Sequence, residues 1–242
     1  MINTVEIIRL EEVDSTNEYM KRLYSGQSLQ HGLVVVANKQ TMGKGQLGKV
    51  WESKEKENLL FTFFSSEKKG KTKEEFSFLV SIALLELIKE YLPQEDITIK
   101  WPNDLLVDGK KIAGILIENR FRGDSIEASF VGVGMNVNQS VFPRFTRQGC
   151  SFKSITGEQF DVYLLAKKLQ HLFFLNAKKS KKEIKRSYDK SLYLVGQKSC
   201  FLLRGSQVFL TIIKVNTKGQ LVTRNEKGEL LEFNVGELKY LS

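Results

Sequence analysis

The sequence predicts an α+β fold followed by a small all-β segment, and two observations carry this prediction. Up to residue 193, short apolar runs typical of strands are interspersed with longer segments whose apolar residues recur at helical spacing. From residue 194 onward, only short strand-like runs remain, separated by Lys-Gly and Asn/Gly turns. We therefore expect a first domain at residues 1–193 and a barrel-like second domain at residues 194–242.

The first elements have recognisable boundaries. Residues 5–13 alternate loosely between apolar and polar and predict a strand. Ser15 and Glu18 have capping-box spacing at the start of a helix that ends at Gly26. The apolar run at 32–38 predicts a strand buried on both faces. Further strands are expected at 58–65, 98–101, 111–118, 126–133, 199–203, 207–216, 220–223 and 230–234, and further helices at 75–92, 160–177 and 182–192.

Residues 98–118 carry the most informative pattern for a binding site. Two strand-like runs flank the Asp-Gly pair at 108–109, which favours a tight hairpin turn because glycine adopts positive φ without strain. Lys100, Asp104 and Lys111 surround this hairpin. Burying such charges is costly unless they meet an opposite charge. We therefore expect an anionic, phosphate-bearing ligand to bind here.

Two glycine-containing segments predict a close approach of the backbone to a ligand. Residues 39–51 contain three glycines and three lysines, which suit either a mobile anion-binding lid or an ordinary flexible loop. The Gly-x-Gly-x-x-Gly spacing of this segment also occurs in dinucleotide sites, but no helical pattern follows it here. Residues 132–138 place two glycines beside two asparagines, which is a weaker signal. As a lid, the first segment would be mobile until an anion binds.

The composition restricts the class of protein. The net charge is +9, from 37 basic and 28 acidic residues, which fits nucleic acid, an acidic protein partner or anionic small molecules as ligands. Two cysteines do not make a disulfide framework. Neither a signal peptide nor an apolar run of the roughly 18–20 residues needed to cross a membrane is evident. We expect a cytoplasmic protein with no membrane partner, in which His31 and His171 are structural and the lysine cluster at 178–182 is a solvated turn.

The most specific motif of the chain reads Lys-Trp-Pro-Asn-Asp at residues 100–104. Together with further motifs in order along the whole chain, it resembles the pattern of the biotin–protein ligase family. The resemblance implies a class II synthetase-like, biotin–lipoate ligase fold, with a mixed β-sheet, flanking helices and a C-terminal SH3-like β-barrel. The motifs that carry the resemblance are Glu12–Asn17, Gln40–Trp51, Lys100–Asp104, Lys111–Leu116, Gly132–Val137 and Gly236–Leu238.

The resemblance also implies a two-step, ATP-dependent reaction. Biotin and ATP, with Mg²⁺, would form biotinyl-5′-AMP, and biotin would then pass to a lysine of a biotin carboxyl carrier protein. Lys111 would be the catalytic residue, because a compact cation suits a place between the biotin carboxylate and the α-phosphate. Biotin would contact Ser15, Thr16, Asn17, Gln40, Lys44, Gly45, Gln46, Lys111 and Gly114. The ATP or adenylate would contact Gly43, Lys44, Gln46, Trp51, Lys100, Asn103, Asp104, Lys111, Gly132, Gly134 and Asn136, and Asp104 would bind Mg²⁺.

Two departures from the family pattern lead to further expectations. Gln46 stands where the family has an arginine that helps to hold the adenylate, so we expect weaker retention of biotinyl-AMP. Only 14 residues precede Ser15, which is too few for the helix-turn-helix domain of repressor-type members. No DNA binding is therefore expected despite the positive net charge.

Two other functions stay open from the sequence. A lipoate or octanoate protein ligase or transferase would share the fold, although a cysteine-dependent transferase is disfavoured because Cys150 lies outside the motifs. A non-enzymatic biotin sensor would show an added DNA-binding module or a lost catalytic lysine, and neither is evident. Family members occur as monomers and as dimers, and an exposed strand edge could serve a homodimer.

Overall fold

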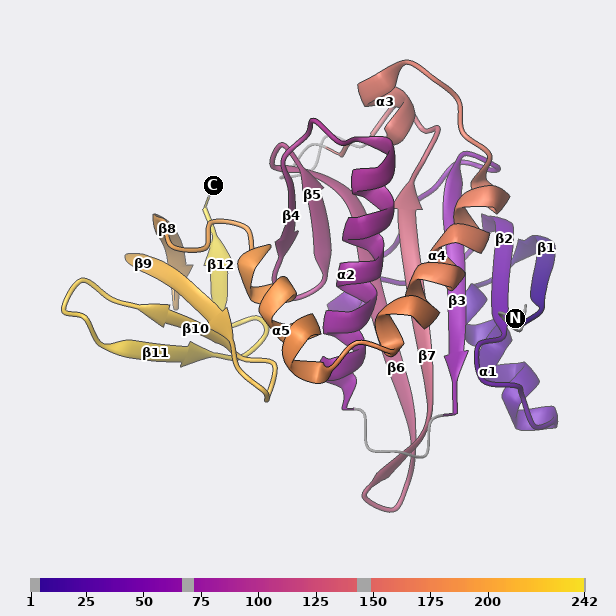
Figure 1. The fold of residues 1–242 in the computed structure, drawn as a ribbon, viewed down its shortest axis with the longest axis horizontal. Coiled ribbons are helices and arrows are strands. Elements are labelled where there is room, and N and C mark those ends of the chain that lie inside the picture. The colour runs from indigo at the N-terminus through magenta and orange to yellow at the C-terminus, as the bar shows by residue number, and fades with distance from the viewer. Residues whose placement is uncertain (1–4, 67–71, 143–148, 242) are drawn as a thin grey trace.

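The computed structural model describes residues 5–66, 72–142 and 149–241, which form two β-sheets with helices against the larger one (Figure 1). The helices are α1 (Thr16–Gly26), α2 (Lys73–Tyr91), α3 (Phe152–Thr156), α4 (Val162–Ala177) and α5 (Lys181–Lys190), with a short 3₁₀ turn at Gln46–Gly48. The strands of the larger sheet are β1 (Ile7–Val13), β2 (Val34–Gln40), β3 (Asn58–Ser65), β4 (Ile97–Lys100), β5 (Asp104–Val107), β6 (Lys110–Arg122) and β7 (Ser125–Asn136). Those of the smaller sheet are β8 (Lys198–Leu203), β9 (Ser206–Val215), β10 (Leu221–Arg224), β11 (Leu230–Phe233) and β12 (Leu238–Tyr240).

The larger sheet is mixed, as the family resemblance implied. Within the described residues its strand order is β1-β2-β3-β7-β6-β5-β4, and β1 with β2 is the parallel pair among otherwise antiparallel neighbours. The register sets Gly114 of β6 opposite Gly134 of β7, and Leu116 opposite Gly132. Because glycine has no side chain, nothing projects from the sheet at these central positions, and other groups can approach the strand backbone closely.

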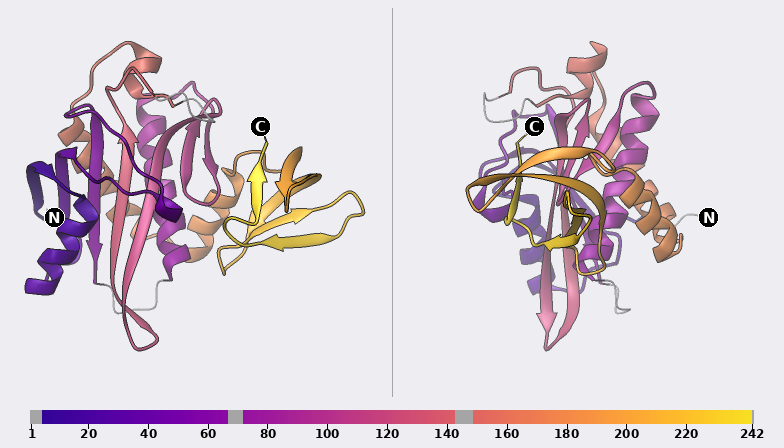
Figure 2. Two further views of the ribbon diagram at one scale, coloured as in Figure 1. Left: turned by 180° about the vertical axis from the view of Figure 1, so that it is seen from behind. Right: turned by 90° about the vertical axis from the view of Figure 1, so that its left-hand side faces the viewer.

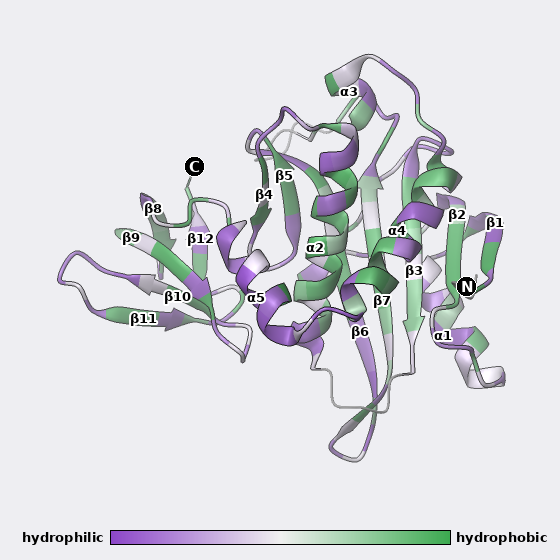
Figure 3. Cartoon of the chain, viewed as in Figure 1, coloured by the Kyte–Doolittle hydropathy of each residue, from purple (hydrophilic) through white to green (hydrophobic). Residues whose placement is uncertain are grey.

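Helices cover the two faces of the larger sheet unequally. α2 and α4 pack together on one face, in front of the sheet in Figure 1. α1 lies on the opposite face, which is turned toward the viewer in the left view of Figure 2. β2 contributes to both cores, because Val34 and Val36 join the cluster under α2 and α4 while Val35 packs with Met20 of α1. Figure 3 shows β2 and β3 as predominantly hydrophobic and α5 as predominantly hydrophilic. The predicted burial of the second strand on both faces is confirmed.

The smaller sheet is antiparallel and is fixed against the β4 edge of the larger one. Within the part of the chain that the structure describes, its strand order is β11-β10-β9-β8-β12. Ile99 N donates to Ser191 O at 2.7 Å, and Tyr193 N donates to Ile99 O at 2.9 Å. Trp101 Nε1 donates to Gly219 O at 2.9 Å. These bonds hold the C-terminal strands beside the end of β4. No helix among the described residues is long and apolar enough to cross a membrane.

The hairpin region contains one strand more than expected. Residues 104–107, expected to lie between the two strands, form β5 and pair with both β4 and β6. The tight turn at Asp108 and Gly109 is confirmed, with φ values of 48° and 72°, but it joins β5 to β6. β12 was also not expected, because three residues are too few to show a strand pattern. The lysine cluster at 178–182 is exposed between α4 and the start of α5, as expected.

The start of α1 differs from the expected capping box. The Ser15 side chain makes no capping hydrogen bond, and Glu18 points elsewhere. Instead, Ser15 N donates to Asp14 Oδ1 at 2.8 Å, and Arg22 donates to both Asp14 oxygens at 2.7 and 2.8 Å. The hydrogen bonds from Arg22 hold the pKa of Asp14 at about 2. An ion pair therefore stabilises the turn into α1 and leaves the Ser15 hydroxyl available.

Candidate active site

A cavity of about 640 Å³ lies between the start of α1, the segment 40–51 and the C-terminal strand β12. A volume of this size is typical of a small-molecule site. Two of the residues predicted for the site, Gly43 and Asn136, do not line it. The predicted residues that do line it are Ser15, Thr16, Asn17, Gln40, Lys44, Gly45, Gln46, Trp51, Lys100, Asn103, Asp104, Lys111, Gly114, Gly132 and Gly134.

Lys111 occupies the floor of the cavity. Its Nζ lies 2.7 Å from Asp104 Oδ1, and the two side chains are 34% and 23% exposed. The same Nζ lies 5.4 Å from the centroid of the Trp51 ring. The cation is thus held between a carboxylate and an aromatic face, in a site only partly open to water. In such a place its charge acts on a ligand more strongly than it would in bulk water.

An irregularity in the pairing of β5 with β6 sets the direction of Lys111. Leu105 pairs with Ala113 and Leu106 with Lys111, so one residue between them is left unpaired. Strict alternation would place Lys111 and Gly114 on opposite faces of β6. An ideal Cβ on Gly114 would instead lie 3.2 Å from Lys111 Nζ, so the two share one face. The bulge therefore turns the lysine into the cavity.

Two asparagines of the predicted site hold the strands that carry these groups. Asn136 is buried, and its Nδ2 donates to Lys111 O at 3.4 Å and to Cys150 O at 3.0 Å. It does not line the cavity, although the resemblance implied a contact with the nucleotide. Asn103 Nδ2 donates to Ile115 O at 3.0 Å, although Asn103 does line the cavity. Both amides therefore support β6 through its backbone.

The start of α1 contributes polar side chains whose partners are already fixed. Gln40 Oε1 accepts hydrogen bonds from Thr16 N and Thr16 Oγ1, at 2.8 and 3.0 Å. Asn17 Nδ2 donates to Glu118 Oε2 at 2.8 Å, and Asn17 Oδ1 accepts from Thr62 Oγ1 at 2.7 Å. Thr16 and Asn17 are both buried. This end of the cavity is thus a rigid set of donors and acceptors, which suits an orienting role.

Glycines on the central strands allow two large groups to lie against the sheet. An ideal Cβ on Gly132 would lie 2.6 Å from Asn17 Oδ1. One on Gly134 would lie 2.3 Å from Trp51 Cε2, and one on Gly114 would lie 3.2 Å from Trp51 Cζ3. Real Cβ atoms essentially never approach within 3.0 Å. Asn17 and Trp51 can therefore take these positions because β6 and β7 have no side chain there.

Backbone bonds tie the start of the segment 40–51 to the body and close its end back onto the segment itself. Thr41 N donates to Val13 O at 2.9 Å, and Trp51 N donates to Gly43 O at 3.0 Å. An ideal Cβ on Gly43 would lie 2.4 Å from Trp51 O. Gly43 therefore serves this close backbone approach and does not itself line the cavity.

Positive charge dominates the cavity wall. Among the described lining residues, Asp104 is the one carboxylate, whereas five are lysines. Lys100 Nζ also lies 4.9 Å from the ring centroid of Tyr240, on the C-terminal strand β12. An excess of cations favours an anionic ligand, in line with the expectation from residues 98–118. In the described part of the chain, no three His, Cys, Asp or Glu side chains are grouped to hold a metal ion. The lysines are Lys44, Lys49, Lys100, Lys111 and Lys239.

Comparison with known proteins identifies the family. The model of the biotin/lipoate A/B protein ligase family matches residues 10–136, slightly more than half of the chain. The chain belongs to this family. The matched range contains every cavity residue from α1 through Gly134, including Lys111 and Asp104. The family therefore shares the part of the fold that builds the floor of the cavity.

Curated relatives within the ligase family are moderately similar. Over 135 residues the chain is 35% identical to the bifunctional ligase/repressor BirA of Bacillus subtilis. The aligned region covers 54% of this chain and 41% of that protein. Over 130 residues it is 33% identical to the biotin–[acetyl-CoA-carboxylase] ligase of Paracoccus denitrificans, and the aligned region covers 53% of each protein. The chain spans about half the length of the curated relatives it matches.

Solved structures of ligases are similar over nearly the whole chain. The biotin protein ligase from Aquifex aeolicus in complex with biotin and ATP has a TM-score of 0.80 and 28% identity, and the match covers 97% of both chains. The Leishmania major ligase in complex with biotinyl-5-AMP has a TM-score of 0.64 and 25% identity, covering 95% of this chain and 99% of that one. The likeness thus extends over both sheets.

One part of the ligase-family cavity was not found from the sequence. β12 and the turn before it add a further wall, which includes Lys239 and Tyr240. The Gly-Glu-Leu motif at 236–238 was a usable signal, but the resemblance connected it with the end of a domain and not with a ligand. The C-terminal residues that line the cavity are Val235, Gly236, Leu238, Lys239, Tyr240 and Leu241.

Neither cysteine of this ligase-family chain lines the cavity, and the structure describes both. Cys150 is buried, and its Sγ lies 3.5 Å from Lys110 O. Burial raises the pKa of the Cys150 thiol to about 12. A thiol that stays protonated is a poor nucleophile. The geometry therefore also disfavours a transferase that works through a cysteine.

Proposed function

We propose that this chain is a biotin–protein ligase, which forms biotinyl-5′-AMP from biotin and ATP and transfers the biotin to a lysine of a carrier protein. The observation that carries the proposal is the position of Lys111, whose ammonium lies 2.7 Å from Asp104 on the floor of a lysine-rich cavity. Likeness to the Aquifex aeolicus ligase, in complex with biotin and ATP, supports it over nearly the whole chain.

The first step joins two anions, which is its main physical difficulty. A biotin carboxylate oxygen attacks the α-phosphorus of ATP, and the bond from that phosphorus to the oxygen of the leaving pyrophosphate breaks. A cation between the two reactants reduces their repulsion and stabilises the charge that develops on the phosphate. Lys111 would take that place, and Lys100 would add positive charge from the cavity wall. Trp51, beside Lys111, would pack against the nucleotide.

The opposite end of the cavity suits the ureido ring of biotin. That ring carries two N–H donors and one carbonyl acceptor, so it needs both kinds of partner. Ser15, Thr16, Asn17 and Gln40 offer hydroxyl and amide groups within the cavity wall. Because the hydrogen bonds of Thr16 with Gln40 and of Asn17 with Glu118 already fix these side chains, little reorganisation accompanies binding.

The second step transfers the acyl group. The ε-amine of the acceptor lysine attacks the acyl carbon of biotinyl-AMP, an amide bond forms, the bond from that carbon to the phosphate oxygen breaks, and the amine loses a proton. AMP leaves with the phosphate charge restored. Lys111 would stabilise that charge as it develops, because its Nζ would lie beside the same phosphate in both steps.

Mg²⁺ would accompany ATP at the phosphate end of the cavity. Asp104 fits this role as the one carboxylate among the described lining residues. Mg²⁺ commonly binds through one or two carboxylates together with substrate phosphates and waters, so a larger cluster of acidic residues is not needed. Bound there, the ion would neutralise part of the phosphate charge. Asp104 would share its carboxylate between the ion and Lys111.

The C-terminal sheet would complete the site as part of a second domain. Residues 194–242 would form an SH3-like barrel after a catalytic domain at 1–193, and the antiparallel order of the smaller sheet supports this. Its strand β12 lines the cavity beside Lys100, so it would contact the nucleotide end. The acceptor would be a biotin carboxyl carrier protein domain, and the reaction would occur in the cytoplasm.

Pyrophosphate release tests the proposal with two adjacent lysines. The chain is mixed with ATP, Mg²⁺ and biotin as wild type, Lys111→Ala and Lys110→Ala. Lys110 is a matched control because it is exposed and does not line the cavity. We expect Lys111→Ala to lower kcat/KM by about 10²–10³-fold, as does removal of one preorganised charge-stabilising group, and Lys110→Ala to resemble wild type. Full activity of Lys111→Ala contradicts the catalytic assignment, and a wild type that releases no pyrophosphate contradicts the function.

A further inference from the structure

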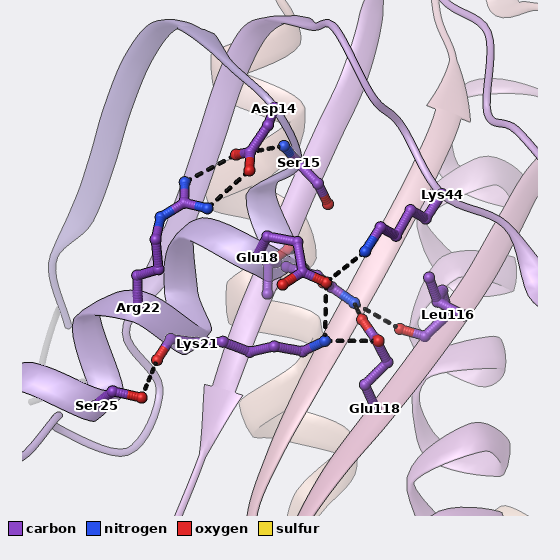
Figure 4. Close-up of polar contacts among 11 residues, drawn as sticks. Asp14, Ser15, Glu18, Lys21, Arg22, Ser25, Lys44, Leu116 and Glu118 are labelled. Carbon is purple, nitrogen blue, oxygen red and sulfur yellow. Dashed lines mark hydrogen bonds and ion pairs between the residues drawn. The ribbon is translucent and has the colours of Figure 1, made fainter.

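Four side chains of alternating charge are connected in a row that begins at Lys44, a residue of the cavity wall (Figure 4). Lys44 Nζ lies 2.7 Å from Glu18 Oε1, and the same oxygen lies 3.1 Å from Lys21 Nζ. Lys21 Nζ in turn lies 2.6 Å from Glu118 Oε1. The four charges cancel, so the cluster adds no net charge to the cavity. Sequence reasoning had given Glu18 only a capping role, which the structure does not show.

This cluster connects three elements that are distant in sequence. Lys44 belongs to the segment 40–51, Glu18 and Lys21 to α1, and Glu118 to β6, the strand that also carries the catalytic lysine. Glu118 is itself fixed, because its other oxygen accepts a hydrogen bond from Asn17 Nδ2 at 2.8 Å. The segment is thereby joined through side chains to the rigid wall of the cavity.

The environment favours the ionised forms of Glu18 and Lys21. The hydrogen bond from Lys44 is the largest influence that lowers the pKa of Glu18, and Lys21 adds to it. Burial alone would lower the pKa of Lys21, but hydrogen bonds with Glu118 and Glu18 raise it above the ordinary value. Glu18 is 28% exposed and Lys44 is 47% exposed, so solvent screens the pair only in part. A network of this kind can hold a loop more firmly than an isolated surface pair.

The backbone bonds of the segment leave its middle dependent on this contact. At one end Thr41 N donates to Val13 O at 2.9 Å and Met42 N donates to Asp14 O at 2.8 Å, and at the other end Trp51 N bonds back to Gly43 O. Between them, Gly45 N donates to Lys49 O at 2.7 Å, which closes the segment on itself and not onto α1. The ion pair of Lys44 with Glu18 is what ties this small closed turn to the helix.

We propose that Glu18 is a positioning residue that holds residues 43–50 of the segment over the cavity through Lys44 before an anionic ligand arrives. Composition alone led to the opposite expectation, that glycines and like charges keep an empty loop mobile. Glu18 takes the place that an anion would otherwise fill, so the loop is ordered in advance. That a pre-ordered segment favours adenylate formation rests on the proposed function. That Glu18 orders the segment does not depend on that function.

Hydrogen exchange of the full chain without biotin or ATP measures the order directly. The peptide that covers residues 40–51 reports opening of the segment through the bonded amides of Gly45 and Trp51. We expect its protected amides to exchange about two- to fivefold faster in Glu18→Gln than in wild type, the range for loss of one partly exposed ion pair. In Glu18→Asp, which keeps the charge, we expect most of the protection to return. A wild-type rate in Glu18→Gln overturns the proposal.

A second ion pair near the base of the loop provides the matched control. Lys39 Nζ lies 2.6 Å from Glu12 Oε2, between β1 and β2. We expect Glu12→Gln to leave exchange of the 40–51 peptide at the wild-type rate, and an acceleration equal to that of Glu18→Gln would overturn the specific role of Glu18. Exchange of the β3 peptide at 58–65 should be the same in every variant. Acceleration there would show that Glu18→Gln acts by general destabilisation and would also overturn the proposal.

A double-mutant cycle identifies Lys44 as the partner. If the pair acts as a unit, Glu18→Gln with Lys44→Gln should exchange no faster than the faster single variant, whereas additive effects contradict the assignment. The results remain interpretable if the proposed function fails, because no substrate is present. Wild type that does not release pyrophosphate would refute the ligase proposal and leave the loop result intact. Unchanged exchange with normal pyrophosphate release would refute only the role of Glu18.

Discussion

Gly134 provides the most direct test of how the cavity floor is built. An ideal Cβ at this position would lie 2.3 Å from Trp51 Cε2 and 2.7 Å from Cδ2 and Cζ2. Carbon atoms pack best at about 3.5–4.0 Å, so the indole must move by about 1 Å or more to admit a methyl group. β7 is a central strand paired on both sides, so the ring moves and not the strand. Overpacking of this kind costs about 1–3 kcal/mol.

The displaced ring should affect the reaction, because Trp51 lies beside Lys111. If 1–3 kcal/mol appears as lost substrate affinity, the KM for ATP in Gly134→Ala should rise by about five- to 150-fold at tenfold per 1.4 kcal/mol. Gly114→Ala should have a smaller effect, since its Cβ would lie 3.2 Å from Trp51 Cζ3 and Lys111 Nζ. Gly26→Ala is the control, because nothing lies within 4 Å of its added Cβ.

The assay combines pyrophosphate release at varied ATP with urea unfolding of each variant. We expect the order Gly26→Ala, Gly114→Ala, Gly134→Ala in increasing effect on the KM for ATP. Tryptophan fluorescence reports the displacement of the ring independently of activity. The reasoning is refuted if Gly134→Ala keeps the wild-type KM, kcat and free energy of unfolding, because the indole would then not depend on the missing side chain.

Three further predictions concern the supports of the site. Asn136→Ala removes the amide that donates to Lys111 O and Cys150 O. The free energy of unfolding in urea should therefore fall by about 1–3 kcal/mol, and an unchanged value contradicts the supporting role. Gln46→Arg should slow the release of biotinyl-AMP in the absence of an acceptor, because arginine can grip a phosphate with two hydrogen bonds; an unchanged release rate refutes this. The pKa of Asp14 in the folded protein is about 2, which lies below its ordinary value. The ion pair with Arg22 therefore stabilises the folded protein above about pH 4, and this contribution is lost as the pH falls toward 2. Asp14→Asn should therefore lower the stability by up to about 1 kcal/mol at pH 7 and by much less at pH 2, and an equal loss at both values contradicts the assignment.

The elements with strong periodicity were predictable, and those set by a few residues were not. The helix at 75–92 and the strand at 58–65 agree with α2 and β3, because long apolar patterns leave little choice of structure. β5 was missed because it begins at Asp104, in a polar stretch that reads as a turn. The capping box at Ser15 was wrong because the carboxylate of Glu18 has a stronger partner, Lys44, which only the folded chain brings near.

The candidate site was predictable where short motifs carry it. Lys111 and Asp104 were expected near an anion, and the structure places them 2.7 Å apart. The bulge that turns Lys111 toward Gly114 could not be foreseen, because period-2 alternation places them on opposite faces. Asn136 was assigned to the nucleotide from its motif, but its burial and its backbone partners depend on tertiary packing. The contribution of Tyr240 depends likewise on how the two sheets meet.

The central claim, activation of biotin on ATP at Lys111, is tested most directly by isotope exchange between pyrophosphate and ATP. The exchange is measured with biotin, with lipoate and with no acid, for wild type and for Lys111→Ala. The account predicts exchange with biotin in wild type, little with lipoate, and a loss of about 10²–10³-fold in the variant. Exchange that is faster with lipoate than with biotin, or that persists in Lys111→Ala, would contradict it.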